Sequence, residues 1–104
     1  QCPVKVILMN NNYLGNVRQW QDLMFNHRRS FTHMLNPHYE ELARAYHIPY
    51  DVVLTHDELK SKVDKMLATD GPYILECAVK EEENVTPMIT PGSAVDEMKL
   101  HLDI

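Results

Sequence analysis

The sequence predicts an α/β fold: half of a doubly wound, mostly parallel sheet with flanking helices. Three apolar segments rich in strand formers, residues 4–9, 50–54 and 73–79, are predicted to be β-strands. Helical patterns lie between them, and strands separated by helices imply parallel crossover connections. Three strands make only about half of an ordinary doubly wound sheet, so we expect the missing half to lie upstream of Gln1.

The first strand, Val4–Met9, is a nearly continuous apolar run with one lysine. Such a run favours a parallel strand that is covered on both faces. Three asparagines, Asn10–Asn12, follow it directly. A helix is predicted from Gly15 to about Phe25, and residues 26–35, which are polar, aromatic and basic without a period, are predicted to form a loop or short irregular helices. The apolar positions at helical spacing in the first helix are Val17, Trp20, Leu23 and Met24.

Two further helices complete the order strand, helix, helix, strand, helix, strand. Asn36 suits an N-cap and Pro37 suits the first position of the second helix, which should end at Ile48-Pro49. Thr55 and Glu58 form a capping-box pattern at the start of the third helix, which Asp70-Gly71-Pro72 should end. The residues expected to face inward from the third helix are Leu59, Val63, Met66 and Leu67.

Composition excludes several classes of protein. The 104 residues suit a single partial domain over residues 1–104, with a Pro- and Gly-containing tail over 80–104 that we expect to be flexible. A net charge of −5 argues against a general nucleic-acid binder or a binder of anionic membranes, because both need basic surface. Cys2 and Cys77 have no CxxC or zinc-like spacing, so we interpret both as reduced packing residues.

The asparagines offer a chemical interpretation and a plain one. In an open parallel sheet, ligands bind beyond the carboxyl ends of the strands, where Asn10–Asn12 lie. The helix N-terminus near Gly15 would attract phosphate, and amide and carbonyl oxygens suit magnesium. Asparagine is also common in turns because it tolerates left-handed backbone, and spacing alone favours that simpler explanation.

A family resemblance changes this balance. The segments LMNNNYLGNVRQWQDLMF, HRRSFTHMLNPHYEELARAY and PMITPGSAVDEM resemble acetolactate synthase, a thiamine-diphosphate enzyme of branched-chain amino acid synthesis, over essentially the whole chain. The first segment matches the end of the family's cofactor motif. The resemblance implies that this chain is the C-terminal part of the thiamine-diphosphate-binding domain, which condenses pyruvate with a second 2-keto acid in the complete enzyme.

The resemblance assigns site residues by position. Asn11 would ligate magnesium through its side chain and Tyr13 through its main-chain carbonyl, while Leu14, Gly15 and Asn16 would lie beside the cofactor. Trp20 matches a tryptophan that lines the substrate channel. Asn16 departs from the family's usual Met or Leu, which leaves substrate preference open. No catalytic residue is assigned to this chain, because the motif's aspartate ligand and the activating glutamate have no counterpart in it.

The same resemblance implies thiamine diphosphate and Mg²⁺ as cofactors, and FAD in the full-length parent. Expected partners are small 2-keto acids, further copies of the subunit and a regulatory subunit, without nucleic acid or membrane. The expected compartment is the cytoplasm, or a plastid or mitochondrion in a eukaryote. Three alternatives stay open: another thiamine-diphosphate carboligase such as glyoxylate carboligase, a keto-acid decarboxylase, and a non-catalytic module that associates with itself. We expect the isolated chain to be inactive.

Overall fold

A computed structural model describes residues 2–102 of the chain. The contacts within it separate two compact units. Among these residues, the first unit combines 2–12 with 35–80, and the second combines 13–34 with 81–102. No helix among the described residues is long and apolar enough to cross a membrane.

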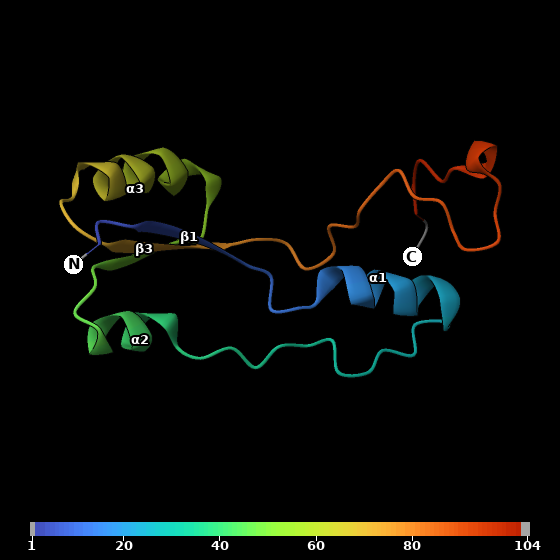
Figure 1. Cartoon of the computed structure of the whole chain (residues 1–104), viewed down its shortest axis with the longest axis horizontal. Coiled ribbons are helices and arrows are strands. Elements are labelled where there is room, and N and C mark those ends of the chain that lie inside the picture. Colours follow the sequence, from blue (N-terminus) through green and yellow to red (C-terminus); the bar gives the residue numbers. More distant parts are fainter. Residues whose placement is uncertain (1, 103–104) are drawn as a thin grey trace. The chain divides into compact units, whose positions relative to one another are not determined.

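The first unit is a three-stranded parallel sheet between two helices. Its strands are β1 (Lys5–Asn10), β2 (Tyr50–Val53) and β3 (Tyr73–Ala78), in the order β1-β3-β2. The helices α2 (Tyr39–Ala45) and α3 (His56–Ala68) lie on opposite faces of the sheet (Figure 1). The predicted α/β class is therefore confirmed, and the three strands begin and end within one or two residues of the predicted bounds.

The apolar core of this unit lies between the sheet and α3. Leu75, on the central strand, is fully buried and packs with Val53, Met66, Tyr73 and Cys77. Alternate residues of β3 point to this face because side chains alternate along a strand. The prediction that Leu67 faces inward is wrong, since its side chain is 64% exposed, and Leu59 lies at the border of exposure. Cys2 is exposed, so only Cys77 is a packing residue.

Strand β1 is the least covered part of the sheet. It pairs with β3 on one side only, and Ile7 and Met9 are 52% and 64% exposed. The prediction of a parallel strand is confirmed, but the prediction that both of its faces are covered is wrong for this chain. The reason is that α2 and α3 pack mainly on β2 and β3. An edge strand with apolar side chains on its faces is a surface that favours pairing.

The predicted N-cap is confirmed for α3 but not for α2. The capping box of α3 is present, and the Glu58 carboxylate accepts hydrogen bonds from the backbone N–H groups of Leu54 and Thr55 at 3.0 and 3.3 Å. These bonds hold the pKa of Glu58 below its usual range. For α2, the N-cap is His38, so the predicted cap at Asn36 is wrong. The Asn36 amide instead donates to the side-chain oxygens of Asn10, the last residue of β1, and of Asn12.

The second unit is built around α1 (Gly15–Met24), with a short 3₁₀ helix η1 (Val95–Glu97) in the tail. Residues 26–35 contain no helix or regular strand, as predicted, and one isolated bridge joins Tyr13 to His33. The predicted inward face of α1 is wrong in large part. The buried residues of α1 are Arg18, Gln19 and Asp22, whereas Val17 and Met24 are about half exposed. The polar face is buried because the loop and the tail bind to it through hydrogen bonds.

Candidate functional site

The three asparagines form a closed turn at the carboxyl edge of the sheet. Asn10 is the last residue of β1, and its side-chain oxygen accepts a hydrogen bond from the backbone N–H of Asn12 at 3.0 Å. This bond closes an Asx-turn with Asn11 at its centre. Asn12 has φ of 59°, in the left-handed region that asparagine tolerates better than most residues. Asn10 closes the turn with its side chain and Asn12 adopts its left-handed backbone, so both positions favour asparagine for structural reasons.

A hydrogen-bond network connects this turn to the central strand. The side-chain amide of Asn10 donates to Glu76 at 2.7 Å, and the Tyr50 hydroxyl donates to the other oxygen of the same carboxylate. The amide of Asn36 donates to the side-chain oxygens of Asn10 and Asn12 at 3.0 and 3.3 Å. Burial, together with the Glu76 carboxylate, raises the pKa of Tyr50 above its usual range. All of these residues belong to the first unit.

The residues after the turn begin the second unit. Leu14 is the N-cap of α1, its backbone N–H donates to the Thr32 carbonyl at 2.8 Å, and its side chain does not cap the helix. Gly15 is the first helical residue, Asn16 is exposed, and the first turn contains no acidic residue. The Tyr13 ring makes an edge contact with His33 and lies 4.4 Å from the Arg18 guanidinium. This helix start has the charge pattern that suits an anion.

The two glutamines that flank Trp20 each bind the backbone of another segment. The Gln19 side chain, which is almost fully buried, donates to the Val85 carbonyl at 2.9 Å and accepts from the Val85 N–H at 2.7 Å. The Gln21 side chain does the same with Ser30, at 2.9 and 3.2 Å. Gln19 therefore joins the tail to α1, and Gln21 joins the loop to it. Trp20 lies between them and is half-buried.

An ion pair between Arg29 and Asp22 also joins the loop of residues 26–35 to α1. The buried Asp22 carboxylate accepts two hydrogen bonds from the Arg29 guanidinium, at 2.7 and 2.9 Å, and lies 3.3 Å from the His27 ring. The Arg29 hydrogen bond holds the pKa of Asp22 below its usual range. The Arg18 guanidinium donates to the Glu81 carbonyl in the tail. The Arg29 side chain is itself 43% exposed, so this ion pair joins a surface arginine to a buried carboxylate.

The available metal ligands are amide and carbonyl oxygens. Within residues 2–102, no group of three or more His, Cys, Asp or Glu side chains could hold a metal ion. The ligands assigned by position, the Asn11 side chain and the Tyr13 carbonyl, are hard oxygen donors of the kind that Mg²⁺ prefers. The donor types of these two assigned ligands therefore suit magnesium.

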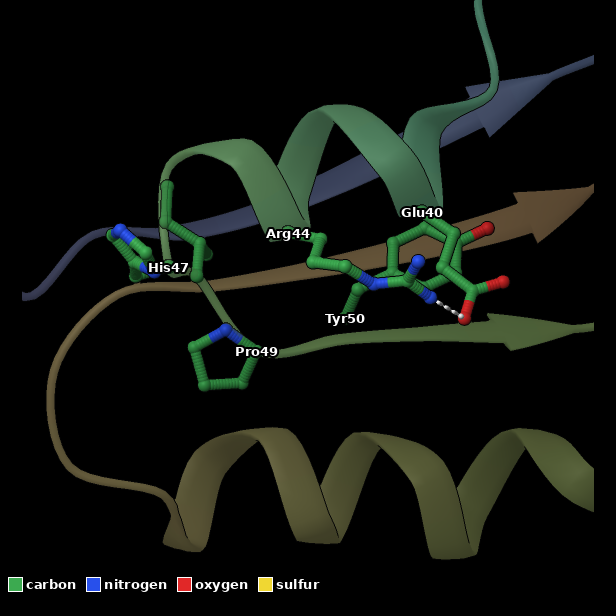
Figure 2. Close-up of a pocket in the computed structure, with 6 residues that line it drawn as sticks. Glu40, Arg44, His47, Pro49 and Tyr50 are labelled. Carbon is green, nitrogen blue, oxygen red and sulfur yellow. Dashed lines mark hydrogen bonds and ion pairs between the residues drawn. The ribbon is translucent and has the colours of Figure 1, made fainter.

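One hollow in the first unit lies away from the asparagine turn. It has a volume of about 350 Å³ and lies where α2 ends and β2 begins. Figure 2 shows the Arg44 side chain turned toward Glu40 beside Tyr50. Arg44 is paired with Glu40 at 3.4 Å and with Glu41 at 2.9 Å, so its charge is already compensated. The hollow therefore does not coincide with the predicted site, which lies at the opposite end of the strands.

Several residues of these networks could not be assigned from the sequence. Glu76 is a single acid within the apolar strand YILECA, and that isolation is the one signal that pointed to it. Asn36 was interpreted as a helix cap, and nothing in its neighbourhood indicated a bond to Asn10. Gln19 belongs to a motif that the resemblance had singled out, but the spacing did not show what it binds.

Comparisons with known proteins agree with the resemblance. The acetolactate synthase isozyme 2 large subunit of Escherichia coli is 41% identical over 94% of this chain, and the mitochondrial acetolactate synthase catalytic subunit of Saccharomyces cerevisiae is 41% identical over 91%. Acetolactate synthase 1 of Zea mays, a chloroplastic protein, is 38% identical over 97%. The chain spans 18%, 14% and 17% of these relatives, respectively. The family described as thiamine pyrophosphate enzyme, C-terminal TPP binding domain, matches residues 1–77, and the chain therefore belongs to this family.

Proposed function

We propose that this chain is part of the catalytic subunit of a thiamine-diphosphate-dependent acetolactate synthase. The observation that carries the proposal is the similarity to three acetolactate synthases over more than nine-tenths of the chain. In the complete enzyme, pyruvate would condense with a second 2-keto acid in the synthesis of isoleucine and valine. When bound, thiamine diphosphate supplies the carbanion chemistry that joins the two acids. The contribution of this chain is to bind the cofactor and shape the substrate site.

The proposed metal ligands are the Asn11 side-chain oxygen and the Tyr13 carbonyl. Asn11 is the central residue of a turn at the carboxyl edge of a parallel sheet, the edge where such folds bind ligands. Leu14, Gly15 and Asn16 would lie beside the diphosphate, at the start of a helix whose first turn contains no acidic residue and whose N-terminal dipole attracts anions. A Mg²⁺ ion held by the Asn11 and Tyr13 oxygens would supply positive charge that compensates the charge of the diphosphate.

Trp20 is the proposed substrate-channel residue. Its side chain is half-buried although it lies on an amphipathic helix, and Gln19 and Gln21 tie down the segments on either side of it. A large rigid indole there would favour a second substrate with an extra methylene. Asn16 is exposed at the start of the same helix, so it is available to contact substrate or cofactor.

The names of the relatives support a wider assembly. Their names include a large subunit and a catalytic subunit, which supports an oligomer with a separate regulatory subunit. FAD would bind in the full-length parent. The relatives include bacterial, mitochondrial and chloroplastic forms, so the compartment would be the cytoplasm in a bacterium and an organelle in a eukaryote.

The test of this proposal is a substitution at the proposed ligand. In the full-length parent, Asn11→Ala removes an amide oxygen from the magnesium site and should raise the thiamine diphosphate concentration needed for half-activity. Asn12→Gly retains the left-handed backbone that Asn12 adopts and should have a much smaller effect. Equal effects at the two positions would return the asparagines to a purely structural turn.

A self-associating module is the second candidate, and the exposed faces of β1 favour it. Val6, Ile7 and Met9 are each more than 40% exposed on an edge strand. Such an edge can pair with a second copy. Light scattering gives the mass of the isolated chain, and a titration measures cofactor binding by the full-length parent. If the isolated chain associates with itself and the full-length parent binds no cofactor, the second candidate is supported.

A further inference from the structure

Residues that are far away in the sequence hold the asparagine turn in place through hydrogen bonds. Asn10 and Glu76 are 66 residues apart, and Asn36 is 26 residues from Asn10. The amide of Asn10 uses both of its ends: its nitrogen donates to Glu76, and its oxygen accepts from Asn36 and from the Asn12 backbone. Rotation of this amide would break all three bonds, so its orientation is determined.

We propose that Asn36, Asn10 and Glu76 are positioning residues that hold the carboxamide of Asn11 at the carboxyl edge of the sheet for binding of Mg²⁺. This inference rests on the proposed function, in which Asn11 is the ligand. Asn11 stands between the two residues that the Asn36 amide joins, Asn10 and Asn12. Its backbone is therefore restrained from both sides.

Glu76 anchors the network because the central strand is the most buried part of the sheet. Its neighbours Leu75 and Cys77 belong to the core on the other face. Both carboxylate oxygens of Glu76 are used, one by Asn10 and one by Tyr50 of the adjacent strand. Charge-assisted hydrogen bonds of this kind are stronger than neutral ones. The turn is thus hydrogen-bonded to a carboxylate whose position is determined by the central strand.

The main test uses Asn36, which contributes only a donor. Apo full-length parent enzyme is titrated calorimetrically with thiamine diphosphate over a series of Mg²⁺ concentrations. Asn36→Ala removes two hydrogen bonds, at 3.0 and 3.3 Å, and the loss of even one hydrogen bond of ordinary strength corresponds to about a fivefold change in an equilibrium constant. Asn36→Ala should therefore raise the Mg²⁺ concentration for half-saturation by about fivefold, with the thermal unfolding midpoint of the apo enzyme nearly unchanged. His38→Ala is the control and should leave the Mg²⁺ midpoint unchanged, since the His38 side chain makes no cap bond.

A second measurement tests the link between Glu76 and Asn10. Asn10→Asp places two carboxylates against each other, whereas adding Glu76→Gln exchanges the amide and the carboxylate and restores every hydrogen bond of the pair. The double variant should bind Mg²⁺ and cofactor more tightly than Asn10→Asp alone. No recovery in the double variant would show that Glu76 does not act through Asn10.

The outcomes separate this inference from the proposed function. If Asn36→Ala lowers the unfolding midpoint but leaves the Mg²⁺ dependence unchanged, the network is only structural and the inference is overturned. If Asn11→Ala shifts the Mg²⁺ dependence and Asn36→Ala does not, the ligand assignment stands and only the positioning role fails. If Asn11→Ala has no effect on Mg²⁺ dependence, the ligand assignment itself fails.

Discussion

The hydrogen bonds between Gln19 and Val85 predict a specific way to release the tail. Gln19 is 1% exposed and bonds both the carbonyl and the N–H of Val85, as a neighbouring strand would, and its amide also donates to the Met88 sulfur at 3.1 Å. Gln19→Met keeps the length of the side chain and removes the donor and the acceptor. The segment around Val85 should then detach from α1 while the first unit, which contains none of these residues, stays folded.

The magnitude follows from the two bonds and from the exposure of Val85. Each hydrogen bond contributes about 0.5–1.5 kcal/mol net. Val85 is 63% exposed, so water can replace part of what its backbone groups lose. We therefore expect the local opening free energy of the tail to fall by about 1–2 kcal/mol, which is roughly a 5- to 30-fold rise in the open population.

The assay is amide hydrogen exchange of residues 81–90 in the full-length parent, followed at fixed pH by mass spectrometry. Gln21→Met is the matched control: it removes the same kind of bond, to Ser30, and should accelerate exchange in residues 26–31 instead. Equal exchange rates of the tail in Gln19→Met and wild type would refute the reasoning. So would an acceleration of the tail of the same size in Gln21→Met.

Three further predictions concern other parts of the chain. Trp20→Leu in the full-length parent should lower the preference for 2-ketobutyrate over pyruvate as acceptor, by up to roughly 10- to 200-fold for one methylene; an unchanged product ratio in a competition assay, with lost thermal stability, would make Trp20 structural. Because the Arg29 hydrogen bond lowers the pKa of Asp22 from 3.8, its stabilisation is complete above that value and is lost as the pH falls through the folded-state pKa. Asp22→Asn should thus flatten the loss of stability below pH 3.8, as measured by urea unfolding. The isolated chain should form no acetolactate from pyruvate with added thiamine diphosphate and Mg²⁺; turnover on the order of 10 per second would contradict this.

The sequence by itself determined the order of the elements and the family. Strand and helix periods are local, so the apolar runs, the capping box at Thr55 and the stop at Gly71 could be located from neighbouring residues alone. The resemblance of the asparagine and Gln-Trp-Gln segments was also visible without coordinates. The family match and the relatives confirmed the resemblance, and the structure confirmed the order of the elements and the capping box.

The periodic pattern failed where a polar side chain found a distant partner. Helix α1 buries Arg18, Gln19 and Asp22, because the tail and the loop supply carbonyls, N–H groups and a guanidinium that compensate the loss of water. A helical period predicts only which residues share a face. It cannot predict that the polar face is the one that this chain covers.

Only the tertiary structure decided what the asparagines do. Asn10, Asn36 and Glu76 belong to three separate segments, and they meet because parallel pairing of β1 and β3 places Asn10 beside Ala78 at one edge. Neither the spacing nor the composition carries that information, since the partners lie 26 and 66 residues apart along the chain. The physical reason is that a side-chain amide is satisfied by whichever donor or acceptor the fold brings within 3 Å, and pairing between distant strands determines which one that is.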